Sequence, residues 1–387
     1  MRRKKDIPRL VWFILPAVVG LIHYFRPSYN NYSIYKGVFY HLIAQTNLYS
    51  LYPNEYFDSN HYGPFFGLIV MPFAALPDYI GLVLWTTFHA FVLYKAFKTL
   101  PLKDANLWIV LMICIVDLNT SSHNVQVNPS IGALIILSWY FVKEEKDFWA
   151  PLFVMIGTFV KLYGIVGLVF WLFSKHKFKY IYSSAFWAII LFVLPMLISS
   201  PTFVLQSYAD WYHSLIEKNL SNQTGSQGIG SYQDVSMMGL FRRVGGLNLS
   251  NATFIIPGLV LQLAPLLRNN YYNNIIFQLR YLATLLIFVV IFSSSSESST
   301  YIVAVSGVAI WFITQDYPIK RWVWALFGAV LIFTSLSASD LFPSHIRHLF
   351  IIYSIKAFPC CILWFGCIYQ LLTDKHSLTD KKWIFQD

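Results

Sequence analysis

The residues best able to take part in a reaction lie between two apolar stretches near the N-terminus. The run EYFDSNHYGP contains Glu55, Asp58 and His61, and its Gly-Pro pair leads directly into an apolar segment. A carboxylate or an imidazole at such a position can take a proton from a hydroxyl group. A hydrated surface loop has the same composition, and spacing alone favours that simpler reading. Asp58, Glu55 and His61 are nevertheless the candidate catalytic residues, with Tyr62 beside them as a candidate for substrate binding.

A single lysine interrupts a long apolar region further along the chain. Lys161 follows the uncharged stretch FWAPLFVMIGTFV and precedes LYGIVGLVFWLF. An ammonium group in hydrocarbon costs roughly 2.5–3.5 kcal/mol on insertion scales. Each stretch is too short to span a bilayer, so two short helices would meet at Lys161 and place it in a cavity or at the surface. There it can bind a phosphate, although snorkelling toward lipid headgroups is the alternative.

Three further polar segments supply candidate binding groups. The run SSHNVQVN offers amides without formal charge, which suit a turn and a sugar hydroxyl equally well. The run QDVSMMGLFRR ends in an arginine pair, and arginine suits bidentate phosphate binding or contact with anionic lipid. A lone acid in SSSSESST can orient a hydroxyl group or simply face water. These segments add the following substrate-binding candidates: Gln126, Asn128, Gln233, Arg242, Arg243 and Glu297.

The composition decides which kind of fold must position these groups. Hydrophobic residues make up 57% of the chain and charged residues only 12%, with a mean hydropathy of +0.54. Soluble domains carry about a quarter charged residues, so the composition excludes a cytosolic enzyme, a disordered chain and a coiled coil. The continuous apolar run AFWAIILFVLPMLI lacks the alternation of a membrane barrel strand. The sequence therefore predicts an all-α, polytopic helical membrane protein.

The hydropathy pattern predicts the elements. Several apolar runs are shorter than the roughly 20 residues of a full span, which indicates short re-entrant or broken helices. We expect about 12 membrane segments, a single integral membrane domain over residues 1–387, and two long extracytoplasmic loops at 27–63 and 200–250. The apolar runs lie near 10–24, 64–76, 79–97, 106–118, 129–142, 148–160, 162–174, 180–199, 252–267, 275–292, 300–314, 321–336 and 346–371.

The charged residues predict the orientation and exclude other partners. The net charge is +10, and the basic residues before the first span include Arg2, Arg3, Lys4 and Lys5. Such clusters mark cytoplasmic loops of a membrane protein rather than nucleic-acid binding. We therefore predict a multi-pass protein of the cell (inner or plasma) membrane with both termini in the cytoplasm.

Neither the cysteines nor the carboxylates argue for a bound metal. Four cysteines lie in apolar runs without a CxxC pair near histidine, so neither a zinc site nor a disulfide framework is predicted. The carboxylates are too scattered to argue for a divalent metal, and we expect no cofactor.

Several short motifs, in order, resemble those of glycosyltransferase family 87. This family has the GT-C fold and consists of transferases that use polyprenyl-phosphate sugars, with mannosyltransferases of bacterial envelope lipids as known examples. The resemblance extends from the first long loop to the tenth span. The motifs that carry it are NYSIY at 31–35, NLY at 47–49, HYGPFF at 61–66, MP at 71–72, LP at 76–77, VQVN at 125–128, KL at 161–162 and QDVS at 233–236.

The resemblance implies transfer of a hexose, mannose-like, from a polyprenyl-phosphate sugar to a lipid or glycan acceptor on the outer face, with inversion. The implied partners are that donor, the acceptor and membrane lipids. The family's catalytic aspartate would fall on Asn31, and an amide cannot act as a general base. Asp58, or else Glu55, would then take the role. Lys161 and the arginine pair would hold the phosphate, while Gln126, Asn128 and Glu297 would bind sugar hydroxyls.

Three other readings remain open at this point. A lipid or polysaccharide transporter or flippase shares the many spans and the intramembrane charge, but it needs a midplane site reachable from both sides. A protein similar to an O-antigen ligase or polymerase would use arginine and histidine without a carboxylate base. A non-catalytic subunit is the third reading, in view of Asn31.

Overall fold

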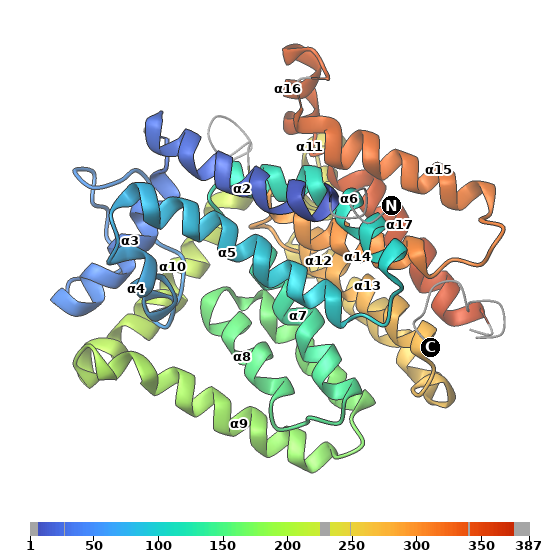
Figure 1. Ribbon diagram of the computed structural model, residues 1–387, viewed down its shortest axis with the longest axis horizontal. Coiled ribbons are helices and arrows are strands. Elements are labelled where there is room, and N and C mark those ends of the chain that lie inside the picture. Colours follow the sequence, from blue (N-terminus) through green and yellow to red (C-terminus); the bar gives the residue numbers. More distant parts are fainter. Residues whose placement is uncertain (1–6, 27, 225–232, 248, 340, 375–387) are drawn as a thin grey trace. The chain divides into compact units, whose positions relative to one another are not determined.

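The computed structural model describes residues 7–26, 28–224, 233–247, 249–339 and 341–374. Across these residues the chain forms helices joined by loops, with no strand among them, which confirms the all-α prediction (Figure 1). Arg2, Arg3, Lys4 and Lys5 lie outside the described residues. Contacts divide the chain into two compact units, whereas the hydropathy pattern suggested one domain. The first unit comprises 1–99 and 121–218, and the second comprises 100–120 and 219–387.

Within the part of the chain that the structure describes, four helical segments are long and apolar enough to cross a membrane. They are α2 (Ile7–Phe25), α5 (Asp78–Thr99), α6 (Asp104–His123) and Lys177–Leu197, which joins α9 (Lys177–Val193) to η2 (Leu194–Leu197). The pair α16 (Ser344–Ile352) and α17 (Ala357–Thr373), bent by 54°, makes a fifth if counted as one span. Shorter apolar helices, as predicted, occupy Ala150–Val160, Leu162–Phe173, Asn251–Leu267, Ile275–Ile291, Ser298–Ile313 and Arg321–Ser335. The number of crossings stays a prediction.

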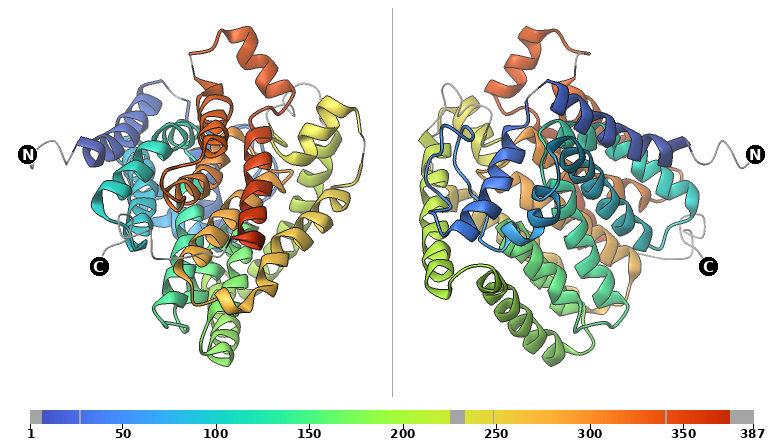
Figure 2. Two further views of the ribbon diagram at one scale, coloured as in Figure 1. Left: turned by 90° about the vertical axis from the view of Figure 1, so that its right-hand side faces the viewer. Right: turned by 60° about the vertical axis from the view of Figure 1, so that its left-hand side comes forward.

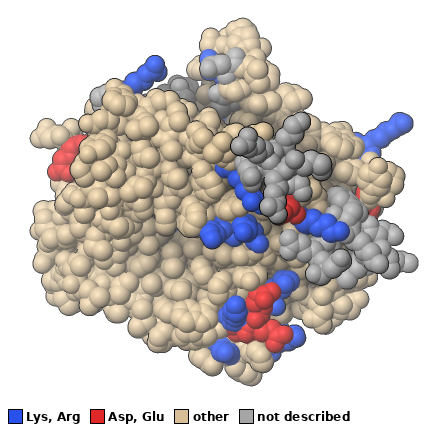
Figure 3. Space-filling view, viewed as in Figure 1, with Lys and Arg blue, Asp and Glu red and all other residues tan. Residues whose placement is uncertain are grey.

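The surface of these helices fits a lipid environment. On the α9–η2 segment, Ile189 is 63% exposed and Leu197 is 79% exposed. Soluble proteins rarely leave such contiguous apolar surface in water. The face shown in Figure 3 is likewise mostly uncharged. Apolar helices with apolar outer surfaces indicate a polytopic membrane protein.

The first unit contains α2 and α5, α3 (Asn30–Ala44), α4 (Phe66–Ala74), α7 (Asn128–Lys143), α8 (Ala150–Val160), η1 (Leu162–Phe173), α9, η2 and α10 (Pro201–Thr224) as far as residue 218. Buried polar groups join its helices. The indole of Trp12 donates to the carbonyl of Ala90 at 2.9 Å, which ties α2 to α5. His89 of α5 lies 2.6 Å from the hydroxyl of Ser130 on α7. Such paired groups fix neighbouring helices where water cannot compete.

The helix break predicted at Lys161 is present. α8 ends at Val160, Lys161 has an extended backbone, and the 3₁₀ helix η1 begins at Leu162. The two helices pack on each other and on α7. A Cβ on Gly164 would lie 2.4 Å from the carbonyl carbon of Gly157, so only glycine permits this close approach.

The two long loops of the sequence prediction contain helices. Residues 30–44 form α3, whose Lys36 ammonium binds Asp78 at the start of α5 at 2.6 Å. Residues 201–224 form α10, which turns sharply away from the α9–η2 segment (Figure 2). Pro201 suits the first turn of α10, since its missing N–H needs no partner there. The extracytoplasmic position of both stretches stays a prediction, and residues 225–232 lie outside the described residues.

The second unit is built around two buried helices, α13 (Ile275–Ile291) and α14 (Tyr301–Ile313), which pack on each other, with α17 against α13. Every residue of α14 and most residues of α13 are buried, as expected for helices enclosed by others, although α13 also contains Gln278 and the buried Arg280. Besides α6 to residue 120, the unit contains α11 (Met237–Gly245), α12 (Asn251–Leu263), η4 (Ala264–Leu267), η5 (Asn269–Tyr271), η6 (Ser298–Thr300), α15 (Arg321–Ala329), η7 (Val330–Ser335), η8 (Leu336–Ala338), α16 and α17.

Candidate functional site

The loop that carries Asp58 and His61 is held in place by α10. The indole of Trp211 donates to the carbonyl of His61 at 2.9 Å, and the hydroxyl of Ser214 donates to the carbonyl of Asn60 at 3.2 Å. A Cβ on Gly63 would lie 2.4 Å from the carbonyl oxygen of Phe159, so the loop passes directly against α8. Two helices therefore fix the end of this loop.

His61 lies at the centre of a group of charged side chains. Its Nδ1 is 2.8 Å from the hydroxyl of Ser214. Burial is the main cause that lowers the pKa of His61 to about 4, and the positive charge of Lys218 acts in the same direction. Asp58 opposes the decrease, and Lys161 adds to it. His61 is therefore a neutral imidazole at pH 7, within electrostatic reach of one carboxylate and two ammonium groups.

Asp58 and Lys218 form the exposed edge of this group. Oδ2 of Asp58 lies 3.7 Å from Nζ of Lys218, and the carboxylate is 56% exposed while the lysine is 18% exposed. The other oxygen, Oδ1, accepts a hydrogen bond from the backbone N–H of Ser59 at 2.8 Å. Asp58 thus presents a carboxylate to solvent or substrate from a fixed turn.

Lys161 lies at the break between α8 and η1, where the sequence predicted it. Its ammonium donates to Oδ1 of Asn128 at 3.1 Å and lies 4.9 Å from the ring centre of Tyr163. Asn128 is fully buried at the start of α7. An amide oxygen and an aromatic face both stabilise an ammonium group, so these contacts hold Lys161 beside the start of α7.

The predicted polar pair Tyr62 and Gln126 is also joined. The phenol of Tyr62 donates to Oε1 of Gln126 at 2.9 Å, and it lies 3.2 Å from the hydroxyl of Tyr35. The ring of Tyr62 stacks on Phe66 with centroids 4.4 Å apart. The first unit therefore brings Asp58, His61, Tyr62, Gln126, Asn128 and Lys161 into one connected region.

Two candidates of the first loop have other partners. Glu55 lies 3.1 Å from Nε2 of His41, on α3. Asn31, at the position of the family aspartate, donates from its amide to the carbonyl of Asn124 at 2.8 Å. Asp58 is consequently the loop carboxylate that stands beside His61.

The remaining candidates lie in the second unit. Arg242 pairs with the carboxylate of Asp234 and donates to Asn251 at 2.9 Å. Arg243 donates to the carbonyl of Gln233 at 2.5 Å and to the hydroxyl of Ser354 at 2.7 Å. Both guanidinium groups therefore hold the loop that precedes α11.

Asp234 and Glu297, two acids of this unit, have local structural contacts. Burial raises the pKa of Asp234, and hydrogen bonds from Ser236 and Arg242 oppose that shift. Glu297 forms a capping box with Thr300 at the start of η6. Its carboxylate thereby satisfies backbone N–H groups of that short helix.

The sequence reading missed Lys218, together with Trp211 and Ser214. These residues share one helix, but the stretch 200–250 contains many Gly, Ser, Asn and Gln residues and was assigned to a loop. The signal that indicates the helix is the spacing of Tyr208 and Trp211, followed by Ser214 and Lys218, at intervals of three or four residues. Among the residues that the structure describes, no three His, Cys, Asp or Glu side chains are grouped so that they can hold a metal ion.

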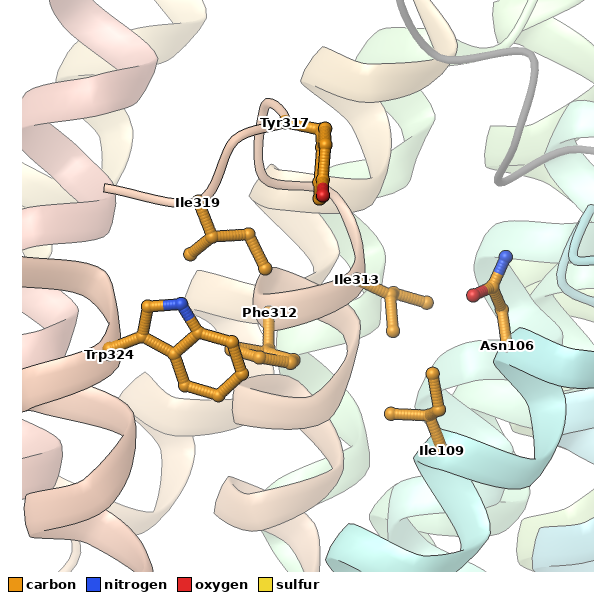
Figure 4. Close-up of a pocket in the computed structure, with 7 residues that line it drawn as sticks. All are labelled: Asn106, Ile109, Phe312, Ile313, Tyr317, Ile319 and Trp324. Carbon is orange, nitrogen blue, oxygen red and sulfur yellow. The ribbon is translucent and has the colours of Figure 1, made fainter. Parts of the chain in front are cut away.

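A separate apolar groove of about 510 Å³ lies in the second unit (Figure 4). The side chains that line it come from α6, the end of α14, the loop that follows α14, and α15: Asn106, Ile109, Phe312, Ile313, Tyr317, Ile319 and Trp324. It includes none of the predicted site residues. Its lining suits hydrocarbon rather than a sugar, which needs hydrogen-bonding groups.

Comparison with known proteins supports an assignment. Curated proteins gave no match to this chain. The sequence model of glycosyltransferase family 87 matches residues 60–339, which is well over half of the chain and begins at the Asn60–Gly63 turn. The chain therefore belongs to glycosyltransferase family 87 and is a membrane glycosyltransferase.

Proposed function

We propose that this protein transfers a hexose, mannose-like, from a polyprenyl-phosphate sugar to a lipid or glycan acceptor on the outer face of the cell membrane. The observation that carries the proposal is the group around His61, where Asp58 lies 3.7 Å from Lys218 and the charges of Asp58, Lys218 and Lys161 act on the imidazole. Ammonium groups near an exposed carboxylate suit a reaction in which a phosphate leaves and a hydroxyl loses its proton.

The reaction proceeds in one displacement. Asp58 takes the proton of the acceptor hydroxyl, whose oxygen attacks the anomeric carbon from the side opposite the phosphate. The bond between the anomeric carbon and the phosphate oxygen breaks, and its electron pair remains on the phosphate. Lys161 and Lys218 stabilise the charge that develops there, which is where electrostatic catalysis is most effective. The configuration of the sugar is inverted.

The neutral side chains of the site bind the sugar. Tyr62, Gln126 and Asn128 carry donors and acceptors that match sugar hydroxyls, and their mutual contacts hold them in position. His61, neutral at pH 7, can accept or donate a hydrogen bond without adding charge. Gln233, Glu297 and the arginine pair remain candidates for substrate binding.

The location of the reaction follows from the charge pattern. We place both termini in the cytoplasm and the turn at Asp58 on the outer face, in a GT-C arrangement of about 12 membrane segments. The donor then enters from the outer leaflet with its polyprenyl chain in the bilayer.

An assay with purified protein tests the proposal. The protein in detergent or nanodiscs is incubated with a panel of radiolabelled polyprenyl-phosphate sugars and a membrane-lipid acceptor extract. We expect transfer from one donor by the wild type and its loss in Asp58→Asn and Lys161→Ala. If Asp58→Asn retains full transfer activity, Asp58 is not the base. If the wild type transfers sugar from none of the polyprenyl-phosphate sugars, the proposed donor class is wrong.

A further inference from the structure

A buried ion pair in the second unit has no role in the reaction described above. Nζ of Lys356 lies 3.4 Å from Oδ1 of Asp117, and the two residues are 3% and 0% exposed. Asp117 belongs to α6, one of the helices long enough to span a membrane. Oδ2 of Asp117 is buried and accepts no hydrogen bond. The desolvation cost of a buried ion pair is offset only by close geometry and full hydrogen bonding. This pair has neither, so it is not optimised for stability.

Lys356 occupies the bend between two helices. Residues 353–356 connect α16 to α17, which meet at 54°. The hydroxyl of Thr334 donates to the carbonyl of Lys356 at 2.8 Å, and the backbone N–H of Ala357 donates to the carbonyl of Ser354 at 2.9 Å. The ion pair therefore anchors this bend to α6.

The same bend holds the loop that precedes the arginine pair. The hydroxyl of Ser354 donates to the carbonyl of Asp234 at 3.2 Å and accepts a hydrogen bond from Arg243 at 2.7 Å. Arg243 also donates to the carbonyl of Ile351 at 3.1 Å. Any movement of the bend would move both Asp234 and Arg243.

A second connection runs through an aromatic ring. The ammonium of Lys356 lies 5.1 Å from the ring centre of Tyr301, and the phenol of Tyr301 donates to the carbonyl of Val235 at 2.9 Å. The backbone N–H of Val235 in turn donates to Ser296 at 2.8 Å. Lys356 thus contacts both the acid on α6 and the ring that holds the loop.

We infer that Asp117 and Lys356 are positioning residues, which fix the 233–236 loop and the α11 arginines by anchoring the bend at 353–356. The pair contacts the arginines only through Ser354, Tyr301 and backbone groups. Lys356 and Ser354 lie beyond the residues that the family model matches, so the anchor comes from a part of the chain that the family pattern does not cover. The expected effect of this anchor on donor binding rests on the proposed function, whereas its expected effect on the order of the 233–236 loop does not.

The test uses the double variant Asp117→Asn/Lys356→Met. Removing one partner would leave an uncompensated buried charge and endanger folding, whereas removing both is tolerated far better. Backbone hydrogen exchange of the full chain in nanodiscs is the first readout. We expect exchange in residues 233–247 to rise about tenfold, with exchange in α13 unchanged, because only the loop loses its anchor. Unchanged exchange in 233–247 would overturn the inference.

Kinetics provide the second readout. We expect the KM for the polyprenyl-phosphate sugar to rise about fivefold or more while kcat stays within about twofold, as when binding groups lose their position. A rise in exchange without any change in KM would overturn the connection to the donor. If the wild type transfers no sugar and exchange still rises, the proposed function fails while the positioning role stands.

Two further variants complete the design. Lys356→Arg keeps the positive charge and can reach both oxygens of Asp117, so we expect it to retain the exchange pattern of the wild type. Lys320→Met removes an exposed lysine of the same unit and serves as the control. An increase in loop exchange in Lys320→Met equal to that in the double variant would show a general effect of charge and contradict the inference.

Discussion

Oδ2 of Asp58 lies 3.7 Å from Nζ of Lys218, although the two residues lie far apart in the sequence. The first belongs to a turn just before α4 and the second to α10. The contact exists because α10 donates side-chain hydrogen bonds to the backbone of that turn, at Asn60 and His61. It places a carboxylate and an ammonium group side by side, as the proposed transfer requires.

Replacement of Asp58 tests the base. We expect Asp58→Asn to lower kcat by about 100-fold or more, the typical contribution of a positioned general base. Steady-state assays with the donor identified in the panel measure this change. Asp210→Asn, on α10, removes a carboxylate that pairs with amides of Asn47 and Gln206 and should leave kcat within about twofold. Equal losses in both variants would contradict the assignment.

Replacement of the two lysines tests the phosphate site. We expect Lys161→Met and Lys218→Met each to raise the donor KM by about tenfold or more, since a charge-assisted hydrogen bond contributes about 1.5–3 kcal/mol. Lys36→Met removes a lysine that pairs with Asp78 in the same unit and is the matched control. Donor titrations at several salt concentrations measure the effect. If Lys36→Met raises the donor KM as much as Lys161→Met and Lys218→Met do, the two lysines do not form a specific phosphate site.

Because the pKa of His61 is lowered in the folded protein, we predict that stability depends on pH. In the folded protein the pKa of His61 is about 4, so the neutral imidazole is favoured, whereas a histidine in the unfolded chain has a pKa of about 6.5. Between these values the unfolded chain takes up a proton that the folded chain does not. Stability is therefore fully present above about pH 6.5 and falls as the pH decreases toward 4, by roughly 3 kcal/mol at most.

Thermal unfolding in detergent from pH 7 to pH 4 measures that loss. We expect His61→Asn, which keeps a hydrogen bond to Ser214 but cannot titrate, to show a flatter dependence of Tm on pH. His213→Asn, at an exposed position of α10, should retain the slope of the wild type. A slope that does not change in His61→Asn would mean that other groups cause the pH dependence.

Gly63 provides a test of the packing between the Asp58–Gly63 turn and α8. The added methyl of Gly63→Ala would lie 2.4 Å from the carbonyl oxygen of Phe159, so we expect a loss of about 1–3 kcal/mol of stability and a lower kcat. In Gly328→Ala the methyl meets no atom within 4 Å, and helix propensity favours alanine by up to about 1 kcal/mol. Thermal unfolding that ranks the two variants in the opposite order would contradict this geometry.

Cysteine labelling tests the orientation in the membrane. The four native cysteines are buried, so introduced ones report with little background. A membrane-impermeant maleimide on intact cells should label His213→Cys, whereas Lys175→Cys should react only after permeabilisation. Lys161→Cys should react from the outside only, which fits a transferase and not a transporter with a site open to both sides. Labelling from both sides would favour the transporter.

Much of the helical pattern was accessible from the sequence. The apolar runs at 79–97 and 180–199 correspond to Asp78–Thr99 and Lys177–Leu197 in the structure. Hydropathy works here because a bilayer demands continuous apolar helices with satisfied backbones. It failed for α3 and α10, whose polar residues and low overall hydropathy indicated loops. Their helices are stabilised by contacts with distant segments, and a local window does not contain those contacts.

The sequence by itself determined the class of protein, the apolar helices and the residue types able to do chemistry, since composition and periodicity depend only on neighbours along the chain. Only the tertiary structure decided which of these residues meet. It placed Lys218 beside Asp58, engaged Arg243 with Ser354, and buried Asp117 against Lys356. These pairings depend on how helices pack across long stretches of chain, and many packings satisfy one hydropathy pattern.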